Sequence, residues 1–422
     1  MKRKEFLQTL VGIPLLASID HFAQSSGGHK ELVANEDFWT KIRKQFYLDD
    51  RSLDFRCNAT SSLPNVAFDH FVKNYRYIQA YPSSRNREIA NGAKEQLRVS
   101  LADEINCSIS EVAIMRSTTE ALNNAIMGFP FQKGDEVIAS AHEYDSMLGS
   151  LYQQQSRVGI TVKQIDIPYK PESSEQIVEL FRRNITPRTK MLLISHIVWI
   201  SGQIYPVKEL CALAKKHNIF TVIDAAQTFS HIPVDVRDMD CDYLGGSLHK
   251  WAAAPLGTGF LYVKQKNIGK TMPLMGHYNY KADDEAIEKF ENLGATTPVF
   301  DSAAISLEYW KKLGVKLKTQ RTRYLMKLWT ERLRSLSDIT ILTNTDETQS
   351  CGITYFQVKN RGAKDVRDLL SKKHDISVQA FQGYKTTFVD LSNLNAVGIA
   401  TPVFITAKEI ERLFSAVKEI VK

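Results

Sequence analysis

The sequence contains few cysteines, and their arrangement excludes two common kinds of site. Five cysteines occur among 422 residues, at widely spaced positions and without a Cys-x-x-Cys pair. Closely spaced pairs are typical of structural zinc sites, and an even set at regular spacings is typical of a disulfide framework. We therefore predict neither a disulfide framework nor a bound metal.

A basic block and a long apolar run are also missing. Lysine and arginine outnumber aspartate and glutamate by 54 to 47, a net charge of +7, but the basic residues are scattered among acidic ones. Without a basic block that carries interleaved aromatics, we predict no nucleic-acid partner. The apolar run at residues 9–17 is too short for a permanent membrane span.

The first residues nevertheless follow the order of an export signal. A basic start, Met-Lys-Arg-Lys, precedes the apolar run, and polar sequence with serine and glycine comes after it. The string Arg-Lys-x-Phe-Leu-Gln at residues 3–8 resembles a twin-arginine signal in which lysine replaces the second arginine. We predict that residues 1–25 direct export to the periplasm. A cytoplasmic protein with an unprocessed N-terminus is the alternative.

The length of the chain favours two domains, because 422 residues exceed the size at which a single hydrophobic core stops growing. Apolar strand patterns alternate with helical patterns, which predicts an α/β fold with a mostly parallel, doubly wound sheet. We expect residues 26–60 to join the small domain, residues 61–309 to form the large domain, and residues 310–422 to form a smaller α+β domain.

Polar residues follow three predicted strands at the point where each strand ends. Residues 112–115 precede Arg-Ser-Thr-Thr-Glu, residues 136–139 precede the string His-Glu-Tyr, and residues 191–194 precede Ser195 and His196. The carboxyl ends of parallel strands meet at the ligand crevice of an open sheet, so we expect these side chains to lie together.

Two of these strand ends have an alternative structural interpretation. Thr118 and Thr119 open a predicted helix, where hydroxyls and free amides can bind phosphate, but the same string is also a helix capping box. Tyr144 can stack on a planar cofactor or pack in a core. The choice depends on what lies nearby.

Lys250 has the most informative surroundings in the sequence. It lies in Ser-Leu-His-Lys-Trp at residues 247–251, and Asp224 ends the apolar run that precedes this string. A lysine amine condenses with an aldehyde, an aspartate keeps a pyridine nitrogen protonated, and Ser247 and His249 can reach a phosphate. These groups are the ones needed to hold pyridoxal phosphate (PLP) as a Schiff base. A lone solvated lysine is the alternative.

From about Asn58 onward the chain resembles the class V aminotransferases of PLP fold-type I, in the branch of isopenicillin-N-epimerase-like proteins and cysteine desulfurases. The resemblance depends on the order of the motifs Arg-x-Thr-Thr-Glu, Glu-Tyr, Ser-His-x-x-x-x-Ser-Gly, Asp-x-Ala-Gln and Ser-x-His-Lys-Trp. It implies Lys250 as the Schiff-base lysine, Asp224 at the pyridine nitrogen, Gln227 near the phenolic oxygen and Tyr144 on the ring face.

The resemblance also implies a phosphate site and a dimer. The remaining predicted cofactor-binding residues are Thr118, Thr119, His196, Ser247, His249 and Thr296. Thr296, with Thr297 as a neighbouring candidate, matches a threonine that reaches the phosphate of the adjacent subunit. We therefore expect a homodimer in which the active site is shared between subunits.

Three departures from the family pattern bear on the substrate. Trp199 replaces an asparagine that tunes the cofactor, residues 379–390 lack the cysteine that desulfurases need, and Gly398 stands where an arginine binds the substrate α-carboxylate. Cysteine desulfuration is therefore disfavoured. The other cations considered for the clamp are Arg56, Arg85, Arg87 and His277, each of which has a surface role as the alternative.

The predicted function is that of a PLP enzyme that forms an external aldimine with a small amine or amino-acid-derived substrate. Lys250 is its expected proton carrier, and the chemistry is of the aminotransferase, epimerase or lyase type. The alternatives are a cysteine desulfurase or selenocysteine lyase, and a non-catalytic protein that retains the PLP fold.

Overall fold

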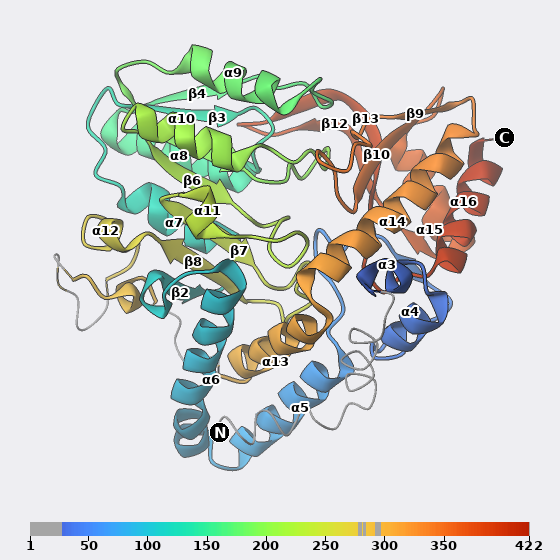
Figure 1. Cartoon of the computed structure of the whole chain (residues 1–422), viewed down its shortest axis with the longest axis horizontal. Coiled ribbons are helices and arrows are strands. Elements are labelled where there is room, and N and C mark those ends of the chain that lie inside the picture. Colours follow the sequence, from blue (N-terminus) through green and yellow to red (C-terminus); the bar gives the residue numbers. More distant parts are fainter. Residues whose placement is uncertain (1–27, 277–280, 282–283, 292–296, 422) are drawn as a thin grey trace.

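The computed structural model describes residues 28–276, 281, 284–291 and 297–421 (Figure 1). The predicted export signal at residues 1–25 lies outside these residues, as do Thr296 and His277. Within the described ranges, no helix is both long and apolar enough to cross a membrane.

A seven-stranded sheet forms the centre of the large domain, in the order β2-β8-β7-β6-β5-β3-β4. β8 is antiparallel to its neighbours β7 and β2, whereas the pairs from β7 through to β4 are parallel. The strands are β2 (Val112–Met115), β3 (Glu136–Ser140), β4 (Thr161–Ile165), β5 (Thr189–Ser195), β6 (Phe220–Asp224), β7 (Tyr243–Ser247) and β8 (Gly259–Val263).

Helices cover both faces of this sheet (Figure 1). α7 packs on α8, and α10 packs on both α9 and α11. These helices are α7 (Thr118–Gly128), α8 (Asp145–Val158), α9 (Ser174–Asn184), α10 (Val207–Lys216) and α11 (Val236–Met239). The predicted mostly parallel, doubly wound α/β sheet is therefore confirmed.

Several strands of the large sheet are buried along their whole length. Every residue of β2, β3, β7 and β8 is buried, the pattern expected of strands with helices on both sides. The predicted strand ends also fall where expected. In the register of β5 with β6, Ser195 lies opposite Asp224, so two polar residues meet at the carboxyl edge of the sheet.

The small domain has its own antiparallel sheet, in the order β12-β13-β10-β9, and a core that includes Trp329, Phe356 and Leu413. A two-stranded parallel sheet joins β1 to β11. The elements are β1 (Leu53–Asp54), β9 (Ile339–Ile341), β10 (Ile353–Val358), β11 (Ile376–Ser377), β12 (Gln379–Lys385), β13 (Asp390–Ala400), α14 (Val315–Arg334), α15 (Ala363–His374) and α16 (Ala407–Val421).

The remaining elements lie along the junction and edges of the two sheets. They are α3 (Gly28–Val33), α4 (Glu36–Arg43), α5 (Asn65–Ala80), α6 (Pro82–Ile105), η1 (Ile109–Glu111), α12 (Gln265–Ile268), η2 (Ile287–Phe290) and α13 (Thr297–Leu313). A third apolar cluster, which includes Trp39, Trp310 and Phe404, connects α4, α13 and the C-terminal segment. The domain boundaries at residues 60 and 309 remain a prediction.

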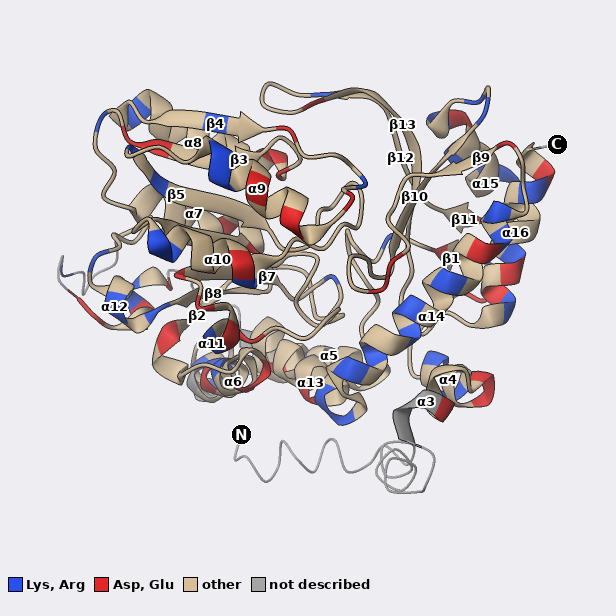
Figure 2. Ribbon diagram, turned by 45° about the horizontal axis from the view of Figure 1, so that its top comes forward, with Lys and Arg blue, Asp and Glu red and all other residues tan. Residues whose placement is uncertain are grey.

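Charges of both signs are distributed over the surface elements (Figure 2). On α16, for example, Lys408 and Arg412 flank Glu409 and Glu411 in the sequence. The scattered charge noted in the sequence thus stays scattered on this helix of the folded chain.

Candidate active site

A cavity of about 360 Å³ lies where the carboxyl ends of the parallel strands face the small domain. Its lining combines strand ends of the large sheet with Asn58 and with Gln379 of β12. The structure places eight predicted site residues on it: Thr118, Thr119, Tyr144, Asp224, Gln227, Ser247, His249 and Lys250. Sequence motifs spread over more than 130 residues therefore converge on one cavity.

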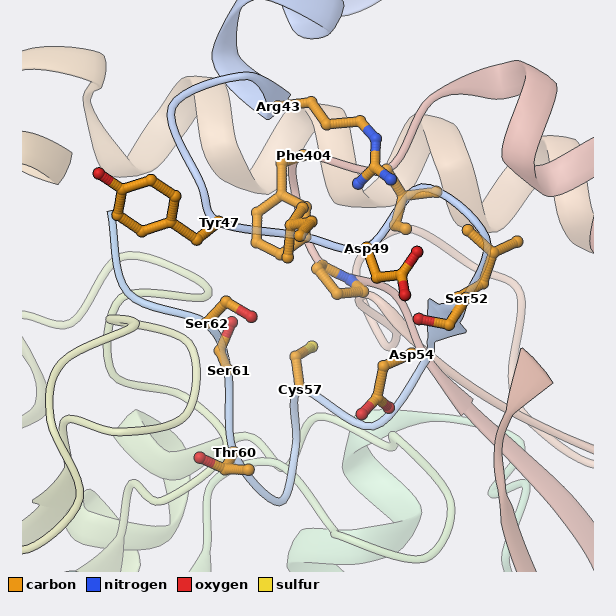
Figure 3. A pocket seen from close by; sticks show the side chains of 14 residues that line it. Arg43, Tyr47, Asp49, Ser52, Asp54, Cys57, Thr60, Ser61, Ser62 and Phe404 are labelled. Atoms are coloured by element: carbon orange, nitrogen blue, oxygen red, sulfur yellow. The ribbon is translucent and has the colours of Figure 1, made fainter. Parts of the chain in front are cut away.

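A second hollow, of about 210 Å³, lies between the N-terminal segment and the C-terminal loop (Figure 3). Arg43, Asp49 and Asp54 contribute to its lining, and Arg43 is paired there with Asp50 and Glu409. None of the predicted site residues lines this hollow, so the strand-end cavity is the candidate active site.

Hydroxyl groups and a helix N-terminus meet at one end of the cavity. The backbone N–H of Thr118 donates to Ser247 Oγ at 2.9 Å, and the two hydroxyls are 2.7 Å apart. Ser117 caps α7 by accepting a hydrogen bond from the Glu120 amide. His249 Nδ1 is buried here without a hydrogen-bond partner among the described residues. This end offers donors to a phosphate group.

Lys250 and Asp224 are the oppositely charged groups of the cavity. Burial lowers the pKa of Lys250, and the charge of Asp224 opposes that shift. Burial likewise raises the pKa of Asp224, while the Ala226 amide, at 2.8 Å from Oδ1, and Lys250 oppose it. A positive group placed against Asp224 would stabilise its ionised form.

Gln227 is held by contacts from both sides of its amide. Its Nε2 donates to the carbonyl of Asn58 at 3.0 Å, and its Oε1 accepts from Trp251 Nε1 at 2.9 Å. His231 stacks on Trp251, with ring centroids 3.5 Å apart, and hydrogen-bonds to the Gln227 carbonyl. The residue after Lys250 therefore fixes the orientation of Gln227.

Tyr144 lies at the open side of the cavity, and 43% of it is exposed. Its ring meets Trp199 edge to face at a centroid distance of 5.5 Å. The neighbouring Glu143 is fully buried and accepts hydrogen bonds from the amide and hydroxyl of Ser195 at 3.0 and 2.5 Å. Burial raises the pKa of Glu143 to about 8 although these hydrogen bonds oppose the shift.

His196 is the described site residue that does not line the cavity. It is buried, its amide donates to the Asp224 carbonyl at 3.0 Å, and burial lowers its pKa to about 4. The structure thus places His196 behind Asp224.

Gly398 faces an aromatic ring from the next strand. It pairs with Tyr355 across β13 and β10, and a Cβ added to Gly398 would lie 2.4 Å from Tyr355 Cε1. The Tyr355 hydroxyl lies 2.7 Å from Gln379 Oε1 and 2.9 Å from the carbonyl of Trp199. Tyr355 therefore occupies the space into which a side chain at residue 398 would project.

The described arginines considered as substitute clamps lie elsewhere. Arg56 pairs with Asp54, and Arg85 lies over the ring of Tyr77 with its guanidinium carbon 4.2 Å from the centroid. Arg87 is exposed. None of these three arginines is part of the cavity lining.

Sequence reasoning assigned no role to Asn58 and Gln379, which line the cavity, or to Tyr355, which contacts them. Asn58 and Gln379 form a reciprocal amide pair, with both N···O distances at 3.0 Å, and Tyr355 hydrogen-bonds to that pair. Asn58 and Gln379 are 321 residues apart, so no local spacing connects them. Glu143 was also missed, although its place between two noted residues at a strand end could have indicated it.

The residues of the cavity fit the chemical groups of PLP. The hydroxyl-rich end with the unpartnered His249 Nδ1 suits a phosphate, Lys250 offers an amine for the aldehyde, and buried Asp224 suits a protonated ring nitrogen. Within the described part of the chain, no group of three or more His, Cys, Asp or Glu residues is arranged to hold a metal.

Comparisons with known proteins agree with this fit. Isopenicillin N epimerase of Amycolatopsis lactamdurans is 25% identical over 405 residues, which cover 91% of this chain and 99% of that protein. A probable cysteine desulfurase of Pyrococcus abyssi is 27% identical over 401 residues, covering 90% and 97%.

Structural comparison identifies the same fold. A solved variant of the enzyme C-DES, with glycine covalently linked to its PLP cofactor, has a TM-score of 0.79 at 21% identity and covers 88% of this chain and 98% of that one. The predicted fold-type I architecture is thereby confirmed. The sequence profile described as aminotransferase class-V matches residues 55–413. The chain therefore belongs to the aminotransferase class-V family of PLP-dependent enzymes.

Proposed function

We propose that this enzyme uses Lys250 to hold PLP and acts on the amino group of a small amine or amino-acid-derived substrate. The reaction is of the aminotransferase, epimerase or lyase type. The observation that carries the proposal is the convergence of Lys250, Asp224 and the hydroxyl-rich phosphate end on one cavity.

Each of these residues has a distinct task in the proposed reaction. Bound PLP supplies an aldehyde for the amine and a ring that accepts electrons. Lys250 carries the proton at the reacting carbon, because burial lowers its pKa and increases the fraction of neutral amine. Asp224 holds a positive charge at the ring nitrogen, and Gln227 is fixed in place by Trp251. Thr118, Ser247 and His249 hold the phosphate.

Desulfuration of free cysteine is the less favoured function. Residues 379–390, where the desulfurase cysteine is expected, form β12 and the turn into β13 and contain no cysteine. The chain's five cysteines are free thiols, and none is part of the cavity lining. A cysteine that accepts sulfur from the substrate would therefore have to come from outside the described lining of the cavity.

Labelling of the lysine tests the proposal. Borohydride reduction of the purified enzyme with PLP should attach the cofactor to the peptide that contains Lys250. The variant Lys250→Ala should lose the attachment, whereas Lys266→Ala, a change at an exposed lysine, should retain it. Attachment that persists in Lys250→Ala would show that the assigned lysine is wrong.

We further propose that the enzyme is an exported homodimer. Residues 1–25 have the order of an export signal, and Thr296 is the residue proposed to reach the phosphate of the adjacent subunit. Fractionation of cells with and without twin-arginine transport, and sedimentation of the purified protein, test the two parts separately. Full-length protein confined to the cytoplasm contradicts the first part, and a monomer with full PLP binding contradicts the second.

A further inference from the structure

Asn58 and Gln379 form one wall of the active-site cavity, and behind Gln379 lies Tyr355. Its ring is fully buried and lies over Gly398, so that even a Cβ at residue 398 would contact Cε1 at 2.4 Å and Cζ at 2.7 Å. Its hydroxyl is anchored to Gln379 and to the Trp199 carbonyl. Because the ring is fixed at both its face and its hydroxyl, this wall has no room for a cationic side chain from residue 398.

Asn58 and Gln379 give this wall an uncharged hydrogen-bonding surface. Their mutual pair uses one N–H of each amide, and each amide has a second N–H. Gln379 Oε1 already accepts from Asn58 and Tyr355, whereas Asn58 Oδ1 has a second lone pair. The pair can therefore offer both donors and an acceptor to a ligand.

Few charged side chains line the cavity. Among the described lining residues the acidic and basic side chains are Asp224, Lys250 and His249, which the proposed function assigns to the cofactor. A carboxylate at the Asn58–Gln379 wall would be desolvated without a cation to pair with it, which is unfavourable for its binding. A neutral group that both donates and accepts avoids this cost.

We infer that the wall formed by Asn58 and Gln379, with Tyr355 packed behind it, selects substrates whose reacting amino group lies next to an uncharged carboxamide, as in an amidated or peptide-linked residue. Asn58 and Gln379 bind the carboxamide, and Tyr355 excludes the arginine that would bind a carboxylate. This inference depends on the proposed function, since it describes the substrate of the same site.

Matched ligands test the inference on the PLP-loaded enzyme. Glycinamide and L-alaninamide are compared with glycine and L-alanine, with each Kd expressed for the neutral-amine form. Binding is followed by the cofactor absorbance and, independently, by calorimetry. We expect the amides to bind at least about tenfold more tightly than the corresponding free acids. The unaltered enzyme suffices for this comparison.

Variants assign the selectivity to the wall. Gln379→Glu should reduce the amide preference at least about fivefold, because it replaces donors with a negative charge. Gln382→Glu, on the same strand but outside the cavity lining, should leave the preference unchanged. Amides that bind no more tightly than acids, including no detectable binding of either, overturn the inference, as does a preference that Gln379→Glu leaves intact. PLP that does not attach to Lys250 would instead overturn the proposed function.

Discussion

The two ends of the active-site cavity are built in different ways. The cofactor end, around Thr118, Asp224 and Lys250, keeps the motif order of the family, and its residues come from the carboxyl ends of neighbouring strands. The substrate end, around Gln379 and Tyr355, departs from the family pattern at Gly398 and draws on the small domain. In the proposed function, one end holds the cofactor, while the other determines which substrate binds.

This difference separates chemistry from selectivity. A change at the cofactor end should reduce the turnover of every substrate, because all of the reactions depend on the cofactor. A change at the substrate end should alter which ligand binds and leave the cofactor in place.

Asp224→Asn should reduce the turnover of any substrate by at least about 10²-fold, or ~2.7 kcal/mol, because a neutral amide does not keep a pyridine nitrogen protonated. PLP should still attach to Lys250, which borohydride labelling would show. Asp238→Asn, at an exposed position on α11, provides the control. Unchanged turnover in Asp224→Asn would remove the assigned role of this carboxylate.

Gly398→Arg should lower the free energy of unfolding by about 3 kcal/mol, since the new side chain would overlap the Tyr355 ring and place a charge in a buried site. In the double variant with Tyr355→Ala, the loss in free energy of unfolding should be about 2 kcal/mol smaller than the sum of the two single losses, because the smaller residue removes the overlap. Denaturant unfolding of the single and double variants measures this coupling. Strictly additive costs would mean that the ring does not occupy the clamp position.

Glu143, which is buried against Ser195, should make the free energy of unfolding depend on pH. Burial raises its folded-state pKa to about 8 from an ordinary 4.5, so the folded protein holds the proton through this interval. The contribution of Glu143 to the free energy of unfolding is fully present below pH 4.5. It decreases by about 1.4 kcal/mol per pH unit as the pH rises to about 8.

Unfolding of Glu143→Gln at several pH values tests this assignment, because the variant should lack that slope. Glu172→Gln, at an exposed position, should keep it. An equal slope in Glu143→Gln and the unaltered enzyme would exclude Glu143 as its source.

Asp145→Ala should weaken substrate binding slightly and leave the cofactor unaffected. Asp145 accepts hydrogen bonds from Tyr384 and from Thr386, the latter at 2.5 Å, and so holds the end of β12 against α8. We expect KM to rise about threefold, or ~0.7 kcal/mol, with faster hydrogen exchange in residues 379–390. Lys385→Ala, which removes an exposed ion pair with Asp390, is the control. A change in the cofactor spectrum would contradict the division.

The sequence predicted the cofactor end well for a physical reason. Strand ends such as Ser195 and Asp224 follow apolar runs directly, and parallel pairing then brings them together. β7 was less visible, because Gly245 and Gly246 weaken a strand pattern. The structure explains both glycines: a Cβ at Gly245 would meet Leu122 at 2.7 Å, and one at Gly246 would meet Phe260 at 2.4 Å.

For the substrate end, the sequence predicted only that an arginine is missing at Gly398. The absence of an arginine at Gly398 could be read from the motif order, but its replacement by a ring from β10 could not. Asn58 and Gln379 are 321 residues apart, and polar residues in a turn and a strand carry no pattern that indicates such a pair. Contacts of this kind depend on the packing of two domains, which local spacing does not encode.

The opposition of Tyr355 and Gly398 also bears on how this enzyme can change over generations. An arginine that arises first meets the ring, and a smaller residue that arises first leaves a void beside the amide pair, so either single step is harmful while the two together are tolerable. The effect of each substitution therefore depends on whether the other is already present. We therefore expect sequence change to alter the residues around the ring more readily than to place an arginine at residue 398.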